Sequence, residues 1–219
     1  MRSIDNIVVP QGVEYQAVCR GLQKAKAQVR VNAIPIGDRN PEAVLSNYSQ
    51  QRKGGGVLIM GLCGSLCKSY TVGNTVVVKS CQNLHGDWLN LDDELTTTIQ
   101  NKLSVDLVRA ITSDRVITRS TEKLKLAREY QADVVDMEGY GYISYLQQQT
   151  GVAMLRVVSD DVTGDIPDIA HTIDQRGQLK TIPLAIALCK QPIAATKLIK
   201  SSLKSLKVLQ QLTTKLFTD

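Results

Sequence analysis

The stretch VVDMEGYGYISYL, residues 134–146, shows how this chain is built. Its first two residues, Val134 and Val135, are typical of a short buried strand, and apolar side chains recur at helical spacing from Gly139 to Gln149. A strand that passes directly into a helix is the repeating unit of α/β proteins. Ligands in such proteins collect at the carboxyl ends of strands, so the acidic junction Asp136–Glu138 is the first candidate for a functional site.

The same alternation of strands and helices continues on both sides of this stretch. Other short β-branched runs predict strands at Ile7–Val9, Val29–Ile36, Val57–Met60, Thr75–Val78, Leu107–Thr112 and Val152–Val158. Periodic segments predict helices at Val13–Ala25, Pro41–Gln50, Glu122–Tyr130, Gly177–Lys190 and Ile193–Leu216. With 219 residues, 43% of them hydrophobic, the chain can bury one sizeable core.

These elements predict a single α/β domain over residues 1–191, a three-layer sandwich with a central mixed β-sheet flanked by helices. Residues 192–219 are expected to form a basic amphipathic helix that packs on this domain or extends from it. One expected strand is followed by Glu14, another by a glycine turn at Gly61–Leu66, and a third by Ser159 and Asp160. We expect these segments to meet Asp136–Glu138 at one edge of the sheet.

The segments at these strand ends resemble a known superfamily. VVDMEGYGYISYL resembles the Val-Asp-Met-Glu stretch of purine nucleoside phosphorylases and methylthioadenosine/adenosylhomocysteine nucleosidases. LRVVSDD (155–161) resembles their Arg-x-x-Ser-Asp motif, VLIMGLCGSL (57–66) their Gly-x-x-Gly turn, VGNTVVV (72–78) their Gly-Asp-x-Val strand, and ITSDRVI (111–117) their Ser-Gly-Asp-x-Phe-Ile segment. The resemblance covers about residues 4–175, and it implies a phosphorylase-like fold and a homodimeric enzyme that cleaves the N-glycosidic bond of a purine nucleoside or adenosyl compound.

The resemblance also implies roles for single residues. Asp160 would protonate the departing base, oriented by Ser159, which requires a buried carboxyl with a raised pKa. Glu138 would accept hydrogen bonds from the ribose hydroxyls, Met137 would pack against the sugar, and Glu14 would activate a water. The other expected substrate contacts are Arg156, Cys63, Gly64, Val116 and Ile117.

Several of these residues also have a structural interpretation. Asp160 could cap a helix, Glu14 could be a first-turn acid favoured by the helix dipole, and Arg156 could be an ion-pair partner. The resemblance implies no cofactor and no metal. Asp161, Asp165 and Asp168 form an acidic loop that no histidine joins, so we expect a solvated loop.

The sequence departs from the superfamily at two places. Ile59 and Leu62 stand where phosphorolytic members have an arginine and a Ser or Thr, which leaves little to bind phosphate and favours hydrolysis. Val116 stands where a phenylalanine usually stacks on the purine. Phosphorolysis of the same bond, and a catalytically weak nucleoside-binding protein, are the alternatives.

The charge is concentrated at the end of the chain. The formal net charge is +5, and residues 190–219 contain six lysines and one acid. Lys197, Lys200, Lys204 and Lys207 form a stripe beside apolar residues, which indicates a docked helix or weak contact with an anionic membrane. No aromatic side chain interleaves the lysines, so nucleic acid is not expected as a partner.

Two further expectations concern location and substrate. The charged N-terminus MRSIDNIVVP does not resemble a signal peptide, and no run of about 18 apolar residues is present, so a cytoplasmic protein is expected. The run Asp174–Gly177, followed by helix, Pro192 and helix, is similar to phosphorylase-like proteins associated with hopanoid synthesis. That similarity implies an adenosyl group on a pentacyclic lipid as one candidate substrate.

Overall fold

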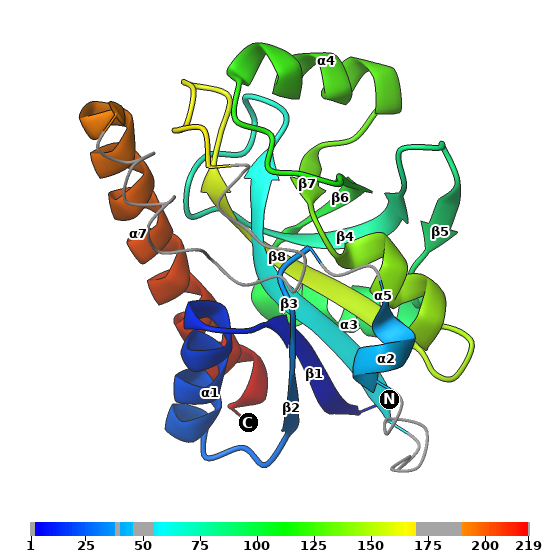
Figure 1. The fold of residues 1–219 in the computed structure, drawn as a ribbon. Helices are drawn as coiled ribbons and strands as arrows, with labels where there is room; N and C mark the ends of the chain where they lie inside the picture. Colours follow the sequence, from blue (N-terminus) through cyan, green and yellow to red (C-terminus); the bar gives the residue numbers. More distant parts are fainter. Residues whose placement is uncertain (1–2, 38–39, 46–54, 170–189, 219) are drawn as a thin grey trace.

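The computed structural model describes residues 3–37, 40–45, 55–169 and 190–218. The expected helix 177–190, apart from its last residue, and the run 174–177 lie outside the described residues, as does the second half of the expected helix 41–50. The centre of the molecule is an eight-stranded mixed sheet with helices on both faces, which confirms the predicted fold class (Figure 1).

The sheet contains parallel and antiparallel pairs. The strands are β1 (Ile4–Pro10), β2 (Arg30–Ile34), β3 (Gly56–Ser65), β4 (Thr75–Gln82), β5 (Trp88–Asn90), β6 (Asp106–Thr112), β7 (Val134–Asp136) and β8 (Val152–Asp160). β3 runs parallel to β1 and β8, whereas β4 runs parallel to β6 and antiparallel to β8. Since β7 pairs with both β6 and β3, the pairings β3–β8–β4–β6–β7–β3 form a closed circuit, and the middle of the sheet closes on itself.

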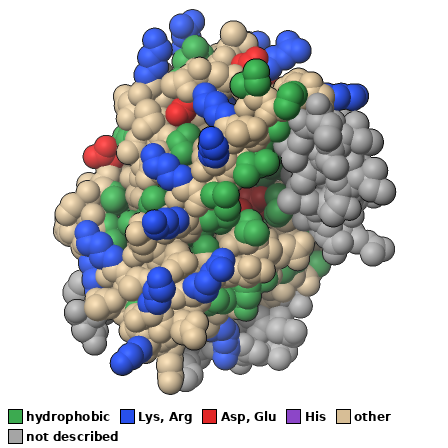
Figure 2. Space-filling view, turned by 90° about the vertical axis from the view of Figure 1, so that its left-hand side faces the viewer, with side chains coloured by type: hydrophobic (Ala, Val, Ile, Leu, Met, Phe, Trp, Pro, Cys, Tyr) green, Lys and Arg blue, Asp and Glu red, His purple; other side chains and the backbone are tan. Residues whose placement is uncertain are grey.

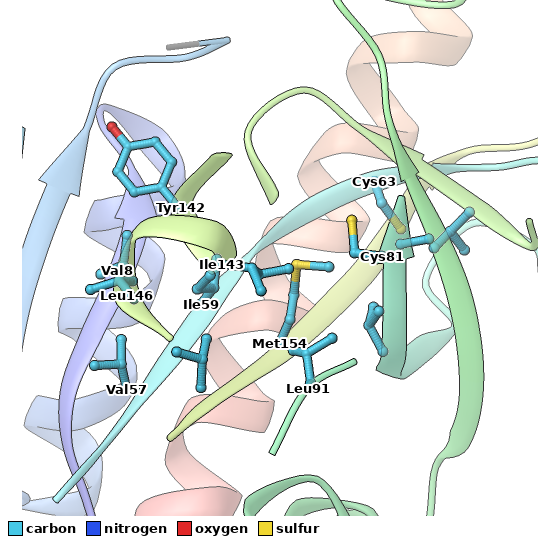
Figure 3. Packing of buried hydrophobic residues seen from close by; sticks show 14 of the residues in the cluster. Val8, Val57, Ile59, Cys63, Cys81, Leu91, Tyr142, Ile143, Leu146 and Met154 are labelled. Atoms are coloured by element: carbon cyan, nitrogen blue, oxygen red, sulfur yellow. The ribbon is translucent and has the colours of Figure 1, made fainter. Parts of the chain in front are cut away.

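Alternating side chains of the strands form two cores, one on each face of the sheet. On one face, Ile7 and Val9 belong to a cluster completed by α1 (Val13–Ala25), α3 (Asp93–Leu103) and α7 (Pro192–Phe217). On the other face, Val8 and Ile59 pack with α2 (Pro41–Leu45) and α5 (Gly139–Leu146). Figure 3 shows Ile143 and Leu146 of α5 beside Ile59, with Met154 of β8 in the same cluster. α4 (Ser120–Tyr130) covers a smaller third cluster around Leu66 and Ile111.

α7 packs along α1 and β8, as Figure 1 shows at the left of the molecule. The two helices approach closely at Gly21, where an added Cβ would lie 2.5 Å from Thr213 Cβ. The predicted apolar stripe divides along the helix, because Leu209 and Leu216 are buried in the core whereas Ile199 and Leu203 are exposed. No helix in the described part of the chain is long and apolar enough to cross a membrane.

One local expectation was wrong, and two elements were missed. The expected glycine turn at Gly61–Leu66 is strand as far as Ser65, because β3 continues to pair with β8 and then with β7. The helix Asp93–Leu103 and the short strand Trp88–Asn90 were not predicted. Asp92 caps that helix by accepting a hydrogen bond from the Leu95 amide at 3.0 Å, a signal that the sequence does contain.

Candidate active site

A cavity of about 280 Å³ opens where β1, β3, β7 and β8 bring their polar ends together. Its lining residues come from seven segments of the chain: Pro10, Glu14, Ile36, Leu62, Cys63, Gly64, Arg115, Val116, Ile117, Val135, Asp136, Met137, Glu138, Ser159, Asp160, Ile166, Ile169, Leu198 and Ser202. All the strand ends that the sequence singled out therefore meet at one place.

Nine of the ten predicted site residues line this cavity: Asp160, Glu14, Glu138, Met137, Ser159, Cys63, Gly64, Val116 and Ile117. The tenth, Arg156, is buried in β8 and is not among the lining residues. Of its two interpretations, the structure supports the ion-pair partner, since its guanidinium contacts Asp136. The structure thus brings nine of the predicted residues together around one cavity.

Glu14 lies in the first turn of α1, with its carboxyl group turned toward β3. Its Oε2 accepts a hydrogen bond of 2.7 Å from the Leu62 amide. A side chain on Gly61 would prevent this approach, because a Cβ there would lie 2.7 Å from the same oxygen. Although the residue as a whole is only partly buried, desolvation of the carboxyl raises the pKa of Glu14 to about 7, against the lowering effects of the Leu62 amide and Arg156.

Glu138 follows β7 and precedes the first residue of α5. Its Oε1 accepts a hydrogen bond of 2.7 Å from the amide of Gly37. Burial, followed by the nearby charge of Asp136, raises the pKa of Glu138 to about 7. Two carboxyl groups with a pKa near neutrality therefore line one cavity.

Behind these acids lies the ion pair of Arg156, whose partner the sequence analysis did not identify. Arg156 donates to Asp136 Oδ2 from Nε at 3.1 Å and from Nη2 at 2.5 Å. Asp136 Oδ1 accepts from the Thr112 hydroxyl at 2.7 Å and from the Gly139 amide at 3.1 Å. Burial opposes the charged form of Arg156, but the pKa of the guanidinium is raised because Asp136, Glu138 and Glu14 surround it.

Asp160 ends β8, and both of its carboxylate oxygens have partners. Ser159 Oγ donates to Oδ1 at 3.0 Å, as the orienting role requires, and also to the Cys63 carbonyl at 3.2 Å. Oδ2 forms an ion pair with the ammonium of Lys123, a fully buried residue of α4. Asp160 is therefore half of an ion pair with Lys123, a contact that the sequence analysis did not predict.

The apolar part of the cavity wall is aliphatic. Among the described lining residues no aromatic ring is present, so nothing there replaces the phenylalanine whose place Val116 takes. Tyr142 is buried in the apolar cluster with Ile143 and Leu146 and is not among the lining residues. Ile166 and Ile169 follow β8, and Leu198 and Ser202 come from α7. No signal in the sequence indicated that the C-terminal helix contributes to the site.

No model of a known protein family matches this chain, and no curated protein matches it. Solved structures do match. The 5′-methylthioadenosine/S-adenosylhomocysteine nucleosidase of Neisseria meningitidis is similar with a TM-score of 0.67 at 14% identity, over 95% of this chain and 97% of that chain. The fold of this chain is therefore the one seen in that nucleosidase.

Two Helicobacter pylori proteins show the same nucleosidase-type fold. The 5′-methylthioadenosine/S-adenosylhomocysteine nucleosidase has a TM-score of 0.61 at 16% identity, over 97% of each chain. Futalosine hydrolase has a TM-score of 0.57 at 16% identity, over 90% of this chain and 96% of that chain. Identities this low establish the nucleosidase-type fold alone.

Proposed function

We propose that this protein hydrolyses the N-glycosidic bond of a purine nucleoside or adenosyl compound. The observation that carries the proposal is the joint presence of Glu14, Glu138 and Asp160 around one cavity of about 280 Å³. The solved structures with this fold include two nucleosidases and a hydrolase by name, which supports the same class of reaction.

In the proposed reaction, water attacks the sugar carbon while the base departs. Glu14 takes the proton of the water, and its pKa of about 7 suits a general base at neutral pH. Glu138 accepts hydrogen bonds from the ribose hydroxyls, with Met137 against the sugar. Asp160 delivers a proton to the purine nitrogen, so that the base leaves as a neutral molecule.

Three features of the site favour water over phosphate as the nucleophile. Ile59, at the position of the phosphate-binding arginine, is buried in the apolar core. The Leu62 amide, which could contact an anion, already donates to Glu14. Of the described residues that line the cavity, Arg115 is the one cation, and it forms an ion pair with Glu122. A phosphate dianion would lie beside Glu14 with little positive charge to stabilise it.

The direct test is release of free base from a panel of nucleosides, including 5′-methylthioadenosine, S-adenosylhomocysteine, adenosine and inosine, with and without phosphate. We expect free base and free sugar at a rate that phosphate does not change. A phosphorylated sugar as the main product would replace hydrolysis by phosphorolysis. Tight nucleoside binding with no product under either condition would favour the catalytically weak binding protein.

Two further properties are proposed beyond the chemistry. A homodimer is proposed from the superfamily resemblance, and light scattering in solution tests it. We also propose weak contact with anionic membranes through α7. Figure 2 shows that the face bearing α7 carries many basic side chains and few acidic ones, with hydrophobic side chains between them. Exposed Ile199 and Leu203 lie on the same side of α7 as Lys200 and Lys207.

A further inference from the structure

Lys123 has surroundings that are unusual for a lysine. It is the only residue of α4 that is fully buried, although lysine is among the side chains least often found inside a protein. Its neighbours on the helix, such as Lys125 and Arg128, are exposed. A buried ammonium group destabilises the folded state unless an anionic group pairs with it. The buried position of Lys123 therefore depends on an ion pair.

The partners of Lys123 belong to the candidate active site. Nζ forms an ion pair with Asp160 Oδ2, and it also lies 3.4 Å from the Asp161 carbonyl oxygen. Asp160 Oδ1 is held by Ser159. Lys123 is not among the lining residues, whereas its partner Asp160 is. Lys123 can therefore act on a bound substrate only by way of the Asp160 carboxyl group.

This pairing creates a requirement for the proposed reaction. A carboxylate in an ion pair has no proton of its own to give to a leaving base. The proton nearest to Asp160 is on the ammonium of Lys123, whose nitrogen contacts Oδ2 directly. Lysine can release such a proton to a neighbouring group, whereas arginine is effectively always protonated.

We propose, on the basis of the function proposed above, that Lys123 supplies through Asp160 the proton that the departing base receives. A proton moves from Nζ to the Asp160 carboxylate, which leaves a neutral amine and a neutral carboxyl. The carboxyl then protonates the purine nitrogen as the electron pair of the breaking C–N bond moves to the base. Glu14 passes the proton of the attacking water to solvent, and the amine of Lys123 regains one from solvent, so charge and atoms balance.

Other titratable groups surround this pair. Asp161 follows Asp160, and its carboxylate accepts hydrogen bonds from Thr163 and Val72. Hydrogen bonds from Ser120 lower the pKa of Asp165, with a smaller contribution from the charge of Lys123. Burial raises the pKa of the Cys63 thiol beside Asp160, so the thiol stays neutral. Within the described ranges, the anionic side chain in direct contact with Lys123 is that of Asp160.

The experiment compares kcat and KM across pH for the full-length protein and its Lys123→Met variant. Without the ammonium, Asp160 must take a proton from solvent before each turnover, so we expect kcat near neutral pH to fall about 10²-fold, the lower part of the range for general-acid catalysis. The deficit relative to the wild type at the same pH should narrow as the pH falls, and KM should change little because Glu138 and Met137 still hold the sugar. Lys125→Met, on the exposed side of the same helix, is the matched control with an unchanged profile.

Lys123→Arg keeps the positive charge and removes the transferable proton. We expect its kcat to fall at least tenfold while its thermal unfolding temperature stays close to that of the wild type. If Lys123→Met does not fold, Lys123→Arg alone tests whether Lys123 supplies the proton. A kcat within threefold of wild type in Lys123→Arg, or an unshifted pH profile in a folded Lys123→Met, would show that Lys123 only neutralises a buried acid. A wild-type protein that releases no base from any nucleoside would instead overturn the proposed function itself, and this inference with it.

Discussion

Arg156 in β8 and Asp136 at the end of β7 form a buried ion pair in which two guanidinium nitrogens contact one carboxylate oxygen. The ion pair links two strands that are not hydrogen-bonded to each other in the sheet. β7 pairs with β3 and β6, whereas β8 pairs with β3 and β4. It also places a positive charge behind Glu14 and Glu138. The pair therefore sets both the position and the charge of the site.

Replacing Arg156 by Met should lower the free energy of unfolding by about 3–5 kcal/mol, because the change leaves Asp136 as an uncompensated buried charge. Urea titration measures this, and Arg109→Met, at a partly exposed position of β6, serves as a comparison expected to be near neutral. A loss below 1 kcal/mol for Arg156→Met would mean that Asp136 is neutral or solvated without its partner.

Base release should rise with pH through about 7, because Glu14 must be ionised to take a proton from water and its pKa is about 7. The Leu62 amide and the charges of Arg156 and Asp136 are the groups that tune this value. Glu14→Gln should remove the rise and most of the activity. A pH profile of kcat for the two proteins is the measurement, and a rise that persists in Glu14→Gln would assign it to another group, with Glu138 the first candidate.

Stability should show the opposite dependence on pH. Glu14 and Glu138 have folded-state pKa values near 7, above the ordinary value of 4.5, so the folded state binds more protons than the unfolded state between these pH values. The free energy of unfolding should consequently decrease as the pH rises from about 4.5 to 7. Urea titrations at several pH values measure it, and Glu14→Gln with Glu138→Gln should flatten the slope.

Asp160→Asn should abolish base release while nucleoside binding stays within a few-fold of wild type. The carboxyl acts on charge that develops only as the base departs, whereas binding draws on Glu138 and the aliphatic walls. Single-turnover kinetics and calorimetric binding separate the two effects. A turnover within tenfold of wild type would remove Asp160 from the role of proton donor.

The protein should sediment weakly with anionic vesicles, in a manner that salt suppresses. Each lysine near a charged bilayer contributes about 1 kcal/mol, and the attraction should fade as the Debye length falls from about 10 Å at 0.1 M salt to 3 Å at 1 M. Replacing Lys200 and Lys207 by Gln should release the protein without unfolding it. Lys197 and Lys204 donate to Thr163 and Val72, so they are less free to contact lipid. Wild-type protein that stays in the supernatant at low salt would rule out the membrane contact.

Local periodicity was enough to predict much of the fold. α1 begins and ends at the expected residues, Val13 and Ala25, because apolar spacing along a helix depends on neighbours three and four positions away. The convergence of Glu14 and Asp160 was also predictable, since β1 and β8 both run parallel to β3 and bring their carboxyl ends to one edge. Glu138 was predicted at the same site, although β7, which it follows, runs antiparallel to β3. β3 was predicted too short, because its second half is held as strand by pairing with β8 and β7 and not by local preference.

The sequence by itself thus determined the α/β class, the main strands and helices, and which residues gather at the site. Only the tertiary structure decided the charge state of that site. It placed Lys123 against Asp160 across 37 positions of sequence and Arg156 against Asp136 across 20. The physical reason is that an ion pair depends on burial and on contacts between distant segments. A local pattern records only which face of its own strand or helix a side chain occupies.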